Sequence, residues 1–321
     1  MVDTPPVSDP ASDEDKLTRL VRRAAAAGPP MPCAVVHPVD ATSLSGALDA
    51  AAAALIAPIL VGPAARIRAA ADDAGLDLAG IAIEDVPHSH AAAERAVALV
   101  HAGRTDALLK GSLHTDELMA AVVSREAGLR TERRISHCFI LDVPRYHKPL
   151  VVTDAAINIE PDLETKADIA RNAIDLCRAL GIVRPKLAVL AAVEVVTPKQ
   201  PATLDAAALS KMADRGQIEG GIVDGPLAFD NAISAEAAQT KHLESPVAGD
   251  PDILLVPDLT AGNMLAKQLQ YLAGAESAGV VVGARVPIAL TSRAEGPRAR
   301  LASCAVMRLA VGMRLTRHGN D

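Results

Sequence analysis

The chain has 321 residues, of which half are hydrophobic and only 1% aromatic, and its formal net charge is −7. This length exceeds what one hydrophobic core usually covers, so we expect two domains. Few aromatic rings and an acidic balance argue against nucleic acid and anionic membranes as partners, because base stacking needs aromatic faces and phosphates attract cations. Local arginines would therefore have to hold any anionic ligand.

The cysteines and the first residues indicate a cytoplasmic protein. Residues 1–17 are rich in Pro, Asp and Ser and lack the basic and apolar regions of a signal peptide, which predicts a disordered tail. No apolar run approaches the ~20 residues of a transmembrane helix. The cysteines fit no metal-binding or redox spacing, so we interpret them as reduced and structural. They are Cys33, Cys138, Cys177 and Cys304.

Strand-like and helix-like segments alternate along the chain. Short β-branched runs bounded by Gly or Pro indicate strands, and longer, often alanine-rich segments indicate helices. The expected strands are Cys33–Val36, Leu55–Val61, Ile81–Val86, Asp106–Lys110, Ile135–Val143, Leu150–Thr153, Leu187–Val193, Gly221–Val223, Ile253–Val256, Gly279–Val282 and Ile288–Leu290. The expected helices are Leu44–Ala54, Pro63–Ala74, Ala91–His101, Thr115–Ala127, Leu163–Leu180, Leu204–Arg215, Ala235–Lys241, Gly262–Ala273 and Arg298–Arg314. This alternation predicts an α/β fold with mostly parallel sheets.

The turn after the last expected strand carries Thr291-Ser292-Arg293, just before a helix expected to begin near Pro297. Open α/β sheets bind ligands where strands end and helices begin, and the exposed amides of a helix start favour an anion. Ser292 can donate its hydroxyl, and the planar fork of Arg293 suits a phosphate or a carboxylate. Taken alone, Arg293 is more typical of an ordinary surface residue after a strand than of a ligand site.

Other loops at the ends of expected strands share one composition. Each mixes Gly or Ala with Ser, Thr, Asn or Asp, so the backbone can approach a ligand closely and offer N–H donors. Any one of them is ordinary turn chemistry, but their repetition at the same ends of strands favours a common site. They are Lys110–Thr115, Thr153–Asn158, Asp224–Asp230, Ser245–Gly249 and Pro257–Asn263.

Together these loops resemble the phosphate acetyl/butyryltransferase family. The pairing of Ser-Pro-Val-Ala-Gly (245–249) with Pro-Asp-Leu-x-x-Gly-Asn (257–263) and the later Ser292-Arg293 is highly specific. The resemblance extends from about residue 18 to the end of the chain. In detail it is greatest to the branch whose domain is often fused behind an enoyl-CoA hydratase-like domain.

The resemblance implies a reversible transfer of a short acyl group between coenzyme A and inorganic phosphate through a ternary complex. The enzyme would be a phosphate acetyltransferase or a phosphate butyryltransferase, with acyl-CoA as substrate, no bound cofactor and no metal. The implied fold has two α/β domains flanking a cleft, as in isocitrate and isopropylmalate dehydrogenases, and forms a homodimer. The implied domains are residues 18–138 with 288–321, and residues 139–287.

The resemblance also assigns residues to the reaction. Ser292 and Arg293 match the pair that stabilises charge on the tetrahedral intermediate and the departing thiolate. Glu295 occupies the acidic position of the butyryl-type branch, whereas Ala299 replaces the more distal Asp of the acetyl-type branch. The matched substrate-binding positions are Ser112, His114, Thr115, Asp154, Asp224, Asn263, Gly283, Arg285 and Pro287.

Several alternatives remain open at this point. A dehydrogenase could share the cleft architecture, although no Gly-x-Gly-x-x-Gly follows the first strand, and a non-catalytic acyl-CoA sensor would explain the missing Asp at Ala299. His88-Ser89-His90 is more typical of an exposed turn than of a metal site. The basic segment 130–134 is either a solvated charged face or a grip for the phosphates of coenzyme A.

Overall fold

A computed structural model describes residues 15–290 and 296–317 of the chain. Its strands are β1 (Met31–Val36), β2 (Ile56–Gly62), β3 (Ala82–Asp85), β4 (Ala107–Lys110), β5 (Ser136–Asp142), β6 (Leu150–Thr153), β7 (Lys186–Leu190), β8 (Ile222–Leu227), β9 (Ile253–Leu255), β10 (Glu276–Val282) and β11 (Ile288–Ala289). Its helices are α1 (Lys16–Ala25), α2 (Ala41–Ala52), α3 (Ala64–Ala74), α4 (Ser89–His101), α5 (Thr115–Val122), α6 (Leu163–Ala179), α7 (Pro201–Asp214), α8 (Phe229–Ile233), α9 (Ala235–Thr240), α10 (Leu259–Tyr271) and α11 (Pro297–Arg317).

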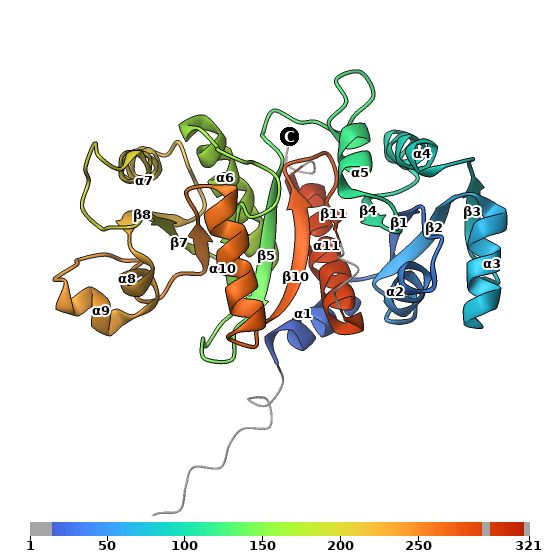
Figure 1. Ribbon diagram of the computed structural model, residues 1–321, viewed down its shortest axis with the longest axis horizontal. Coiled ribbons are helices and arrows are strands. Elements are labelled where there is room, and N and C mark those ends of the chain that lie inside the picture. Colours follow the sequence, from blue (N-terminus) through green and yellow to red (C-terminus); the bar gives the residue numbers. More distant parts are fainter. Residues whose placement is uncertain (1–14, 291–295, 318–321) are drawn as a thin grey trace, which may run out of the picture.

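One 11-stranded sheet runs through the molecule in the order β3-β2-β1-β4-β11-β10-β5-β6-β9-β7-β8 (Figure 1). The strands from β3 to β11 are mutually parallel, as are those from β6 to β8. Between the two groups, β10 is antiparallel to both β11 and β5, and β5 is antiparallel to β6. The expected α/β fold with a mostly parallel sheet is confirmed. The antiparallel strands at the centre of the sheet were not predicted, because a buried apolar run does not reveal the direction of its strand.

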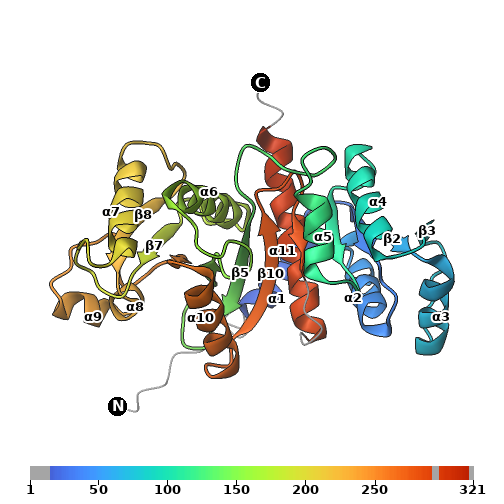
Figure 2. The same ribbon diagram turned by 45° about the horizontal axis from the view of Figure 1, so that its top comes forward.

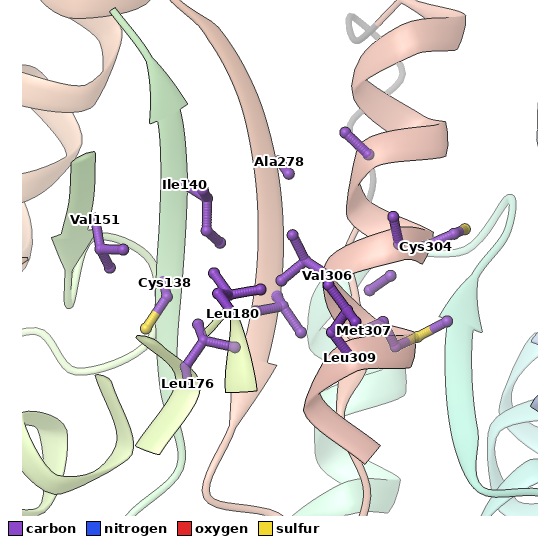
Figure 3. Close-up of a cluster of buried hydrophobic side chains, with 14 of the residues drawn as sticks. Cys138, Ile140, Val151, Leu176, Leu180, Ala278, Cys304, Val306, Met307 and Leu309 are labelled. Carbon is purple, nitrogen blue, oxygen red and sulfur yellow. The ribbon is translucent and has the colours of Figure 1, made fainter. Parts of the chain in front are cut away.

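Three buried clusters divide the helices between the two faces of the sheet. On one face, α1, α2, α6 and α11 pack in a cluster that includes Cys138 and Ile140 of β5 (Figure 3). On the other face, α4 and α5 pack on the first half of the sheet, and α8 and α10 pack on the second half. Both ribbon views place β5 and β10 between α10 and α5 (Figures 1 and 2). On the second face, the cluster under α5 and the cluster under α10 therefore meet over the antiparallel strands β5 and β10.

The element boundaries differ from the sequence expectations in places. Helices α1 and α8 lie outside the expected set, and α1 begins at Lys16, inside the segment expected as a disordered tail. Helix α5 ends at Val122 instead of Ala127, where the N–H of Leu129 turns back to the carbonyl of Val122. The boundary expected between the two domains, at residues 138 and 139, falls inside β5.

The cysteines follow the sequence interpretation. All of them are free and buried: Cys33, Cys138, Cys177 and Cys304. Burial raises the pKa of the Cys138 and Cys304 thiols to about 12, so both stay protonated and unreactive at neutral pH. Across the described ranges, no helix combines the length and the apolar character needed to cross a bilayer.

Helix α11 is tied to the first half of the sheet by a buried arginine. Arg308, 6% exposed, donates from Nη1 to the carbonyls of Ala54 (2.7 Å) and Leu55 (2.9 Å), and from Nη2 to the carbonyl of Gly28. These carbonyls come from the turns that precede β1 and β2. A planar guanidinium can serve three acceptors at once, which a lysine ammonium cannot do in the same plane.

We predict that Arg308→Ala lowers the free energy of unfolding by about 3 kcal/mol, because it leaves buried carbonyls without a donor. Urea unfolding monitored by circular dichroism measures this change. The matched control is Arg298→Ala, on the same helix, whose side chain is 61% exposed and pairs with Asp15 and Glu276. That variant should change stability by about 0.5 kcal/mol or less. Equal losses in the two variants would contradict the prediction.

Candidate functional site on the α5 and α10 face of the sheet

One buried cluster includes residues from the loops after β4, β6 and β10. Leu113 from the loop after β4 and Ala284 and Val286 from the loop after β10 are members of this cluster. Ile157 from the loop after β6 and Leu290 from the end of β11 pack against it. The loops after β6 and β10 meet at one edge of the sheet, where Asn158 Nδ2 donates to the carbonyl of Ile135 and Gly283 approaches the carbonyl of Arg134. The loop after β4 lies toward the other edge, at the start of α5, because β10 is antiparallel to β11 and β4 is parallel to β11. The candidate site extends over these loops along α5.

The loop after β4 carries Ser112, His114 and Thr115. The N–H of Ser112 donates to the carbonyl of His37 (2.9 Å), and Nδ1 of His37 lies 3.3 Å from the carbonyl of Ser112. His114 is exposed at the N-cap position of α5, and half-buried Thr115 is the first residue of that helix. These contacts leave the imidazole of His114 and the first amides of α5 available to a ligand.

His37 is a site residue that the sequence analysis missed. It directly follows β1, is 6% exposed and has a positive φ of 55°, which is uncommon outside glycine. Burial lowers the pKa of its imidazole, so it is neutral at physiological pH. A histidine directly after a strand and three residues before a helix cap at Asp40 is the sequence signal that points to it.

The loop after β6 is organised by Asp154, which is 2% exposed. Its Oδ1 accepts the N–H groups of Ala156 (3.0 Å) and Ile157 (3.1 Å), and its Oδ2 accepts the backbone N–H (3.1 Å) and the side-chain Nδ2 (2.6 Å) of Asn158. Asn158 Nδ2 also donates to the carbonyl of Ile135 (2.9 Å). The carboxylate of Asp154 therefore fixes the shape of the loop.

The start of α10 is joined to the same loop by Asn263. Its Nδ2 lies 3.3 Å from the carbonyl of Ala155, to which it donates. Asp258 caps α10 by accepting the N–H of Ala261 (2.8 Å), which fixes where the helix begins. The structure therefore brings Asn263 next to the Asp154 loop.

The loop after β10 contains Gly283, Arg285 and Pro287. Gly283 has φ of 85°, and a Cβ built on it would lie 2.5 Å from the carbonyl of Arg134, so only glycine fits. The N–H of Arg285 donates to the carbonyl of Leu129 (2.7 Å) while its side chain is exposed. Pro287 is buried, and its carbonyl accepts the N–H of Leu108 (3.2 Å). The backbone is thus fixed and the guanidinium of Arg285 faces solvent.

Comparison with known proteins supports one family. The family model described as "Phosphate acetyl/butaryl transferase" matches residues 89–307. The chain belongs to this family. A phosphate acetyltransferase of Rhizobium meliloti is 59% identical over 93% of this chain and 94% of its own length. A phosphate butyryltransferase of Clostridium acetobutylicum is 40% identical over 87% of this chain and 93% of its own. A crystal structure of a branched-chain phosphotransacylase from Enterococcus faecalis V583 superposes with a TM-score of 0.76 at 28% identity, covering 88% of this chain and 99% of that one.

One expected site residue lies away from the loops of the candidate site. Asp224 lies in β8 at the end of the sheet, separated from β6 by β9 and β7, and accepts the N–H of Gly225 (2.9 Å). Ser292, Arg293 and Glu295, the expected catalytic residues of this phosphate acetyl/butyryl transferase family member, lie outside the described residues.

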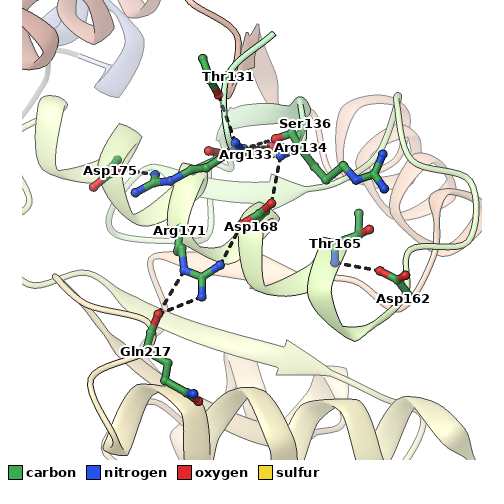
Figure 4. A network of polar contacts seen from close by, with 11 residues as sticks. Thr131, Arg133, Arg134, Ser136, Asp162, Thr165, Asp168, Arg171, Asp175 and Gln217 are labelled. Atoms are coloured by element: carbon green, nitrogen blue, oxygen red, sulfur yellow. Dashed lines mark hydrogen bonds and ion pairs between the residues drawn. The ribbon is translucent and has the colours of Figure 1, made fainter. Parts of the chain in front are cut away.

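The basic segment before β5 is partly engaged in ion pairs (Figure 4). Arg133 Nη1 lies 2.7 Å from Asp175 Oδ2, and the N–H of Arg134 donates to Asp168 (2.9 Å). Arg130 and Arg134 are exposed, as expected for a solvated charged face. This face lies beside the loop after β10, because Thr131 Oγ1 donates to the carbonyl of Gly283 (2.6 Å).

The two histidines lie at the start of α4, His88 at its N-cap position and His90 in its first turn. Nδ1 of His88 accepts the N–H of Ala91 (3.2 Å) and so caps α4, and both His88 and His90 are exposed. Among the residues that the structure describes, no group of three or more His, Cys, Asp or Glu side chains could hold a metal ion.

A second histidine missed by the sequence analysis lies under the site. His137 of β5 is 2% exposed, and burial lowers the pKa of its imidazole to about 4, although the charge of Asp154 acts in the opposite direction. The folded protein therefore keeps this ring neutral where an ordinary histidine, with a pKa of 6.5, would take up a proton. Between these two pH values the unfolded chain binds the extra proton.

We predict that the contribution of His137 to stability is complete above pH 6.5 and is lost as the pH falls toward 4. In His137→Phe, the slope of the unfolding free energy against pH in that window should decrease by the equivalent of about one proton. Urea unfolding at a series of pH values measures the slope. His242→Asn, at an exposed histidine, is the control and should keep the wild-type slope. An unchanged slope in His137→Phe would show that the buried ring already titrates normally.

Proposed function

We propose that this protein is a phosphate acyltransferase that moves a short acyl group between coenzyme A and inorganic phosphate. The observation that carries the proposal is the match of residues 89–307 to the model of this family, together with one buried cluster to which the loops after β4, β6 and β10 contribute. Relatives named as phosphate acetyltransferase and as phosphate butyryltransferase both align over most of the chain, which supports an acyl substrate of short length.

In the proposed reaction, an oxygen of phosphate attacks the carbonyl carbon of the thioester. A C–O bond forms, the C–S bond breaks, and the thiolate of coenzyme A leaves and takes up a proton. Phosphate is itself a competent nucleophile, so positioning supplies much of the rate. Ser292 and Arg293 would donate to the developing negative charge, and Glu295 would exchange the thiol proton in place of the acid that is absent at Ala299.

The described residues offer suitable contacts for the anionic substrates. The first amides of α5 and exposed His114 can donate to phosphate, and exposed Arg285 can pair with the phosphates of coenzyme A. Arg130 and Arg134 lie on the adjoining charged face and could extend the same contact. In this proposal Asp154 and Asn263 hold the opposite wall in place.

We also propose an oligomeric state, a cellular location and a domain arrangement for the enzyme. Helix α10 exposes Met264 (57%) and Tyr271 (74%), seven positions apart on one side of the helix, next to Leu272 (85%). Such apolar exposure on one helix supports a homodimer that covers it. The proposed enzyme is cytoplasmic, works as two domains of the isocitrate dehydrogenase type, and closes residues 18–138 with 288–321 against residues 139–287.

We predict phosphate-dependent release of free thiol from at least one acyl-CoA in a series from acetyl to hexanoyl. A colorimetric thiol assay measures this release, and omission of phosphate is the control. Arsenate, which has the same shape and charge, should replace phosphate. If no chain length is turned over while acyl-CoA still binds by calorimetry, the protein is an acyl-CoA sensor instead.

We predict that Arg293→Ala lowers turnover by about 10²-fold or more, as removal of a donor to a developing oxyanion does. Arg293→Lys should recover little of this loss, because an ammonium group lacks the planar fork of arginine. The control is Arg215→Ala, at an exposed arginine that caps the far end of α7. Wild-type turnover in a folded Arg293→Ala protein would remove this residue from the reaction.

A further inference from the structure

His137 lies at the junction of the two clusters on the α5 and α10 face. Its neighbours along β5 alternate: Cys138 belongs to the cluster on the opposite face, and Phe139 belongs to the α10 cluster on this one. The register pairs His137 with Val281 of β10, a member of the α5 cluster. The imidazole packs edge-to-face on the ring of Phe139, with centroids 4.4 Å apart. The side chain of His137 is therefore directed from the sheet toward the α5 and α10 face.

The ring lies between the Asp154 loop and β10. The register pairs Cys138 with Thr153, so the next residues, His137 and Asp154, face each other across the strands. Thr153 Oγ1 fixes this arrangement by donating to the carbonyl of His137 (2.8 Å). On the other side, Nε2 lies only 3.0 Å from the position that a Cβ on Gly279 would occupy. The absence of a side chain at Gly279 is what admits the ring.

Gly279 in turn connects to the start of α11. Its N–H donates to Ser303 Oγ (2.9 Å), and Ser303 Oγ donates to the carbonyl of Ala299 (2.9 Å) in the first turn of that helix. The carbonyl of Leu290, at the end of β11, lies 3.7 Å from the same Cβ position of Gly279. A continuous series of contacts therefore runs from Asp154 through His137 and Gly279 to Leu290 after β11 and to Ala299 in the first turn of α11.

Packing alone does not account for an imidazole at this position. Within the described part of the chain, no group hydrogen-bonds to Nδ1 of His137, which is completely buried. A buried polar atom left without a partner costs about 1–3 kcal/mol, and a phenyl ring would fill the same space without that cost. An unpaired buried group of this kind needs an explanation other than packing, and local stability given up for activity is one such explanation.

We propose that His137 is a positioning residue for acyl transfer, which sets the Asp154 loop against Leu290 and the first turn of α11. The proposal rests on the proposed function. Ser292 and Arg293 come two and three positions after Leu290 in the sequence, so Leu290 is the anchor from which the chain leads to them. Catalytic groups must be held within about 0.5 Å of their productive positions, and supporting residues behind them provide this precision.

The first experiment compares His137→Phe with Tyr146→Phe. Tyr146 is also buried, and its hydroxyl donates to the carbonyl of Pro251 (2.6 Å) on the far side of β5 from α5. We expect His137→Phe to lower kcat by about tenfold or more and to change the KM for acyl-CoA and phosphate by less than about threefold. His137→Gln, which restores a polar side chain, should recover part of kcat. Tyr146→Phe should keep the wild-type kcat.

The second experiment tests the connection itself. Ser303→Ala removes the acceptor of the Gly279 N–H, and we expect it to lower kcat without changing KM. If the contacts act as one unit, the double variant His137→Phe/Ser303→Ala should be little worse than the more impaired single variant. Multiplying losses would show that the two residues act independently and would overturn the proposed connection, as would a wild-type kcat in folded His137→Phe.

Hydrogen–deuterium exchange separates this inference from the proposed function. In His137→Phe, the amides of Gly279 and of Ala156, Ile157 and Asn158 should exchange faster than in Tyr146→Phe and in the wild type. If the wild type shows no acyl transfer but these amides respond as expected, the proposed reaction is wrong and the positioning role holds for another one. If exchange at these amides is unchanged, His137 does not position the loops, whatever the activity.

Discussion

The antiparallel pairing of β5 with β10 is the constraint on which the rest of the structure depends. It joins two groups of parallel strands that run in opposite directions into one sheet of 11 strands. The seven residue pairs from Ser136–Val282 to Asp142–Glu276 form the register of this joint. Because side chains alternate along both strands, the register also decides which residues face α6 and α11 and which face the site. A slip of one residue would exchange His137 with Cys138 across the sheet.

Much of the architecture could be predicted from the chain. Glycine and proline bounded nearly every strand, and the alternation of strands with alanine-rich helices was enough for the α/β class. Helix α1 gave no such signal, because only Leu17, Leu20 and Ala24 of its residues are buried and the rest are mostly charged. It is a helix because tertiary packing against α11 stabilises one narrow apolar stripe.

The site was predictable to the extent that its residues belong to patterned loops. Ser112, Asp154, Gly283 and Arg285 stand in loops whose glycine and hydroxyl composition identifies them, and all of these loops contribute to one buried cluster. His37 and His137 carry no such pattern, because a single histidine beside a buried strand looks like any other core residue. Asp224 was expected in a loop after a strand and lies inside β8 at the end of the sheet, because the sequence does not show how far a strand extends or where it lies in the sheet.

The electrostatics of the molecule restrict how its substrates can approach. Coenzyme A and phosphate are anions, and a chain with a formal charge of −7 repels them at long range. Much of its positive charge is neutralised locally, as in the pairs Arg133–Asp175 and Lys166–Asp205. Exposed Arg130, Arg134 and Arg285 lie together beside Gly283, so attraction is confined to one edge of the site. Because such exposed charges are screened beyond about 8 Å at physiological salt, they act only on a substrate already close to the loops. Affinity must then come from short contacts made by fixed donors. The buried residues that hold the loops in place, such as Asp154 and His137, therefore matter as much as the exposed arginines.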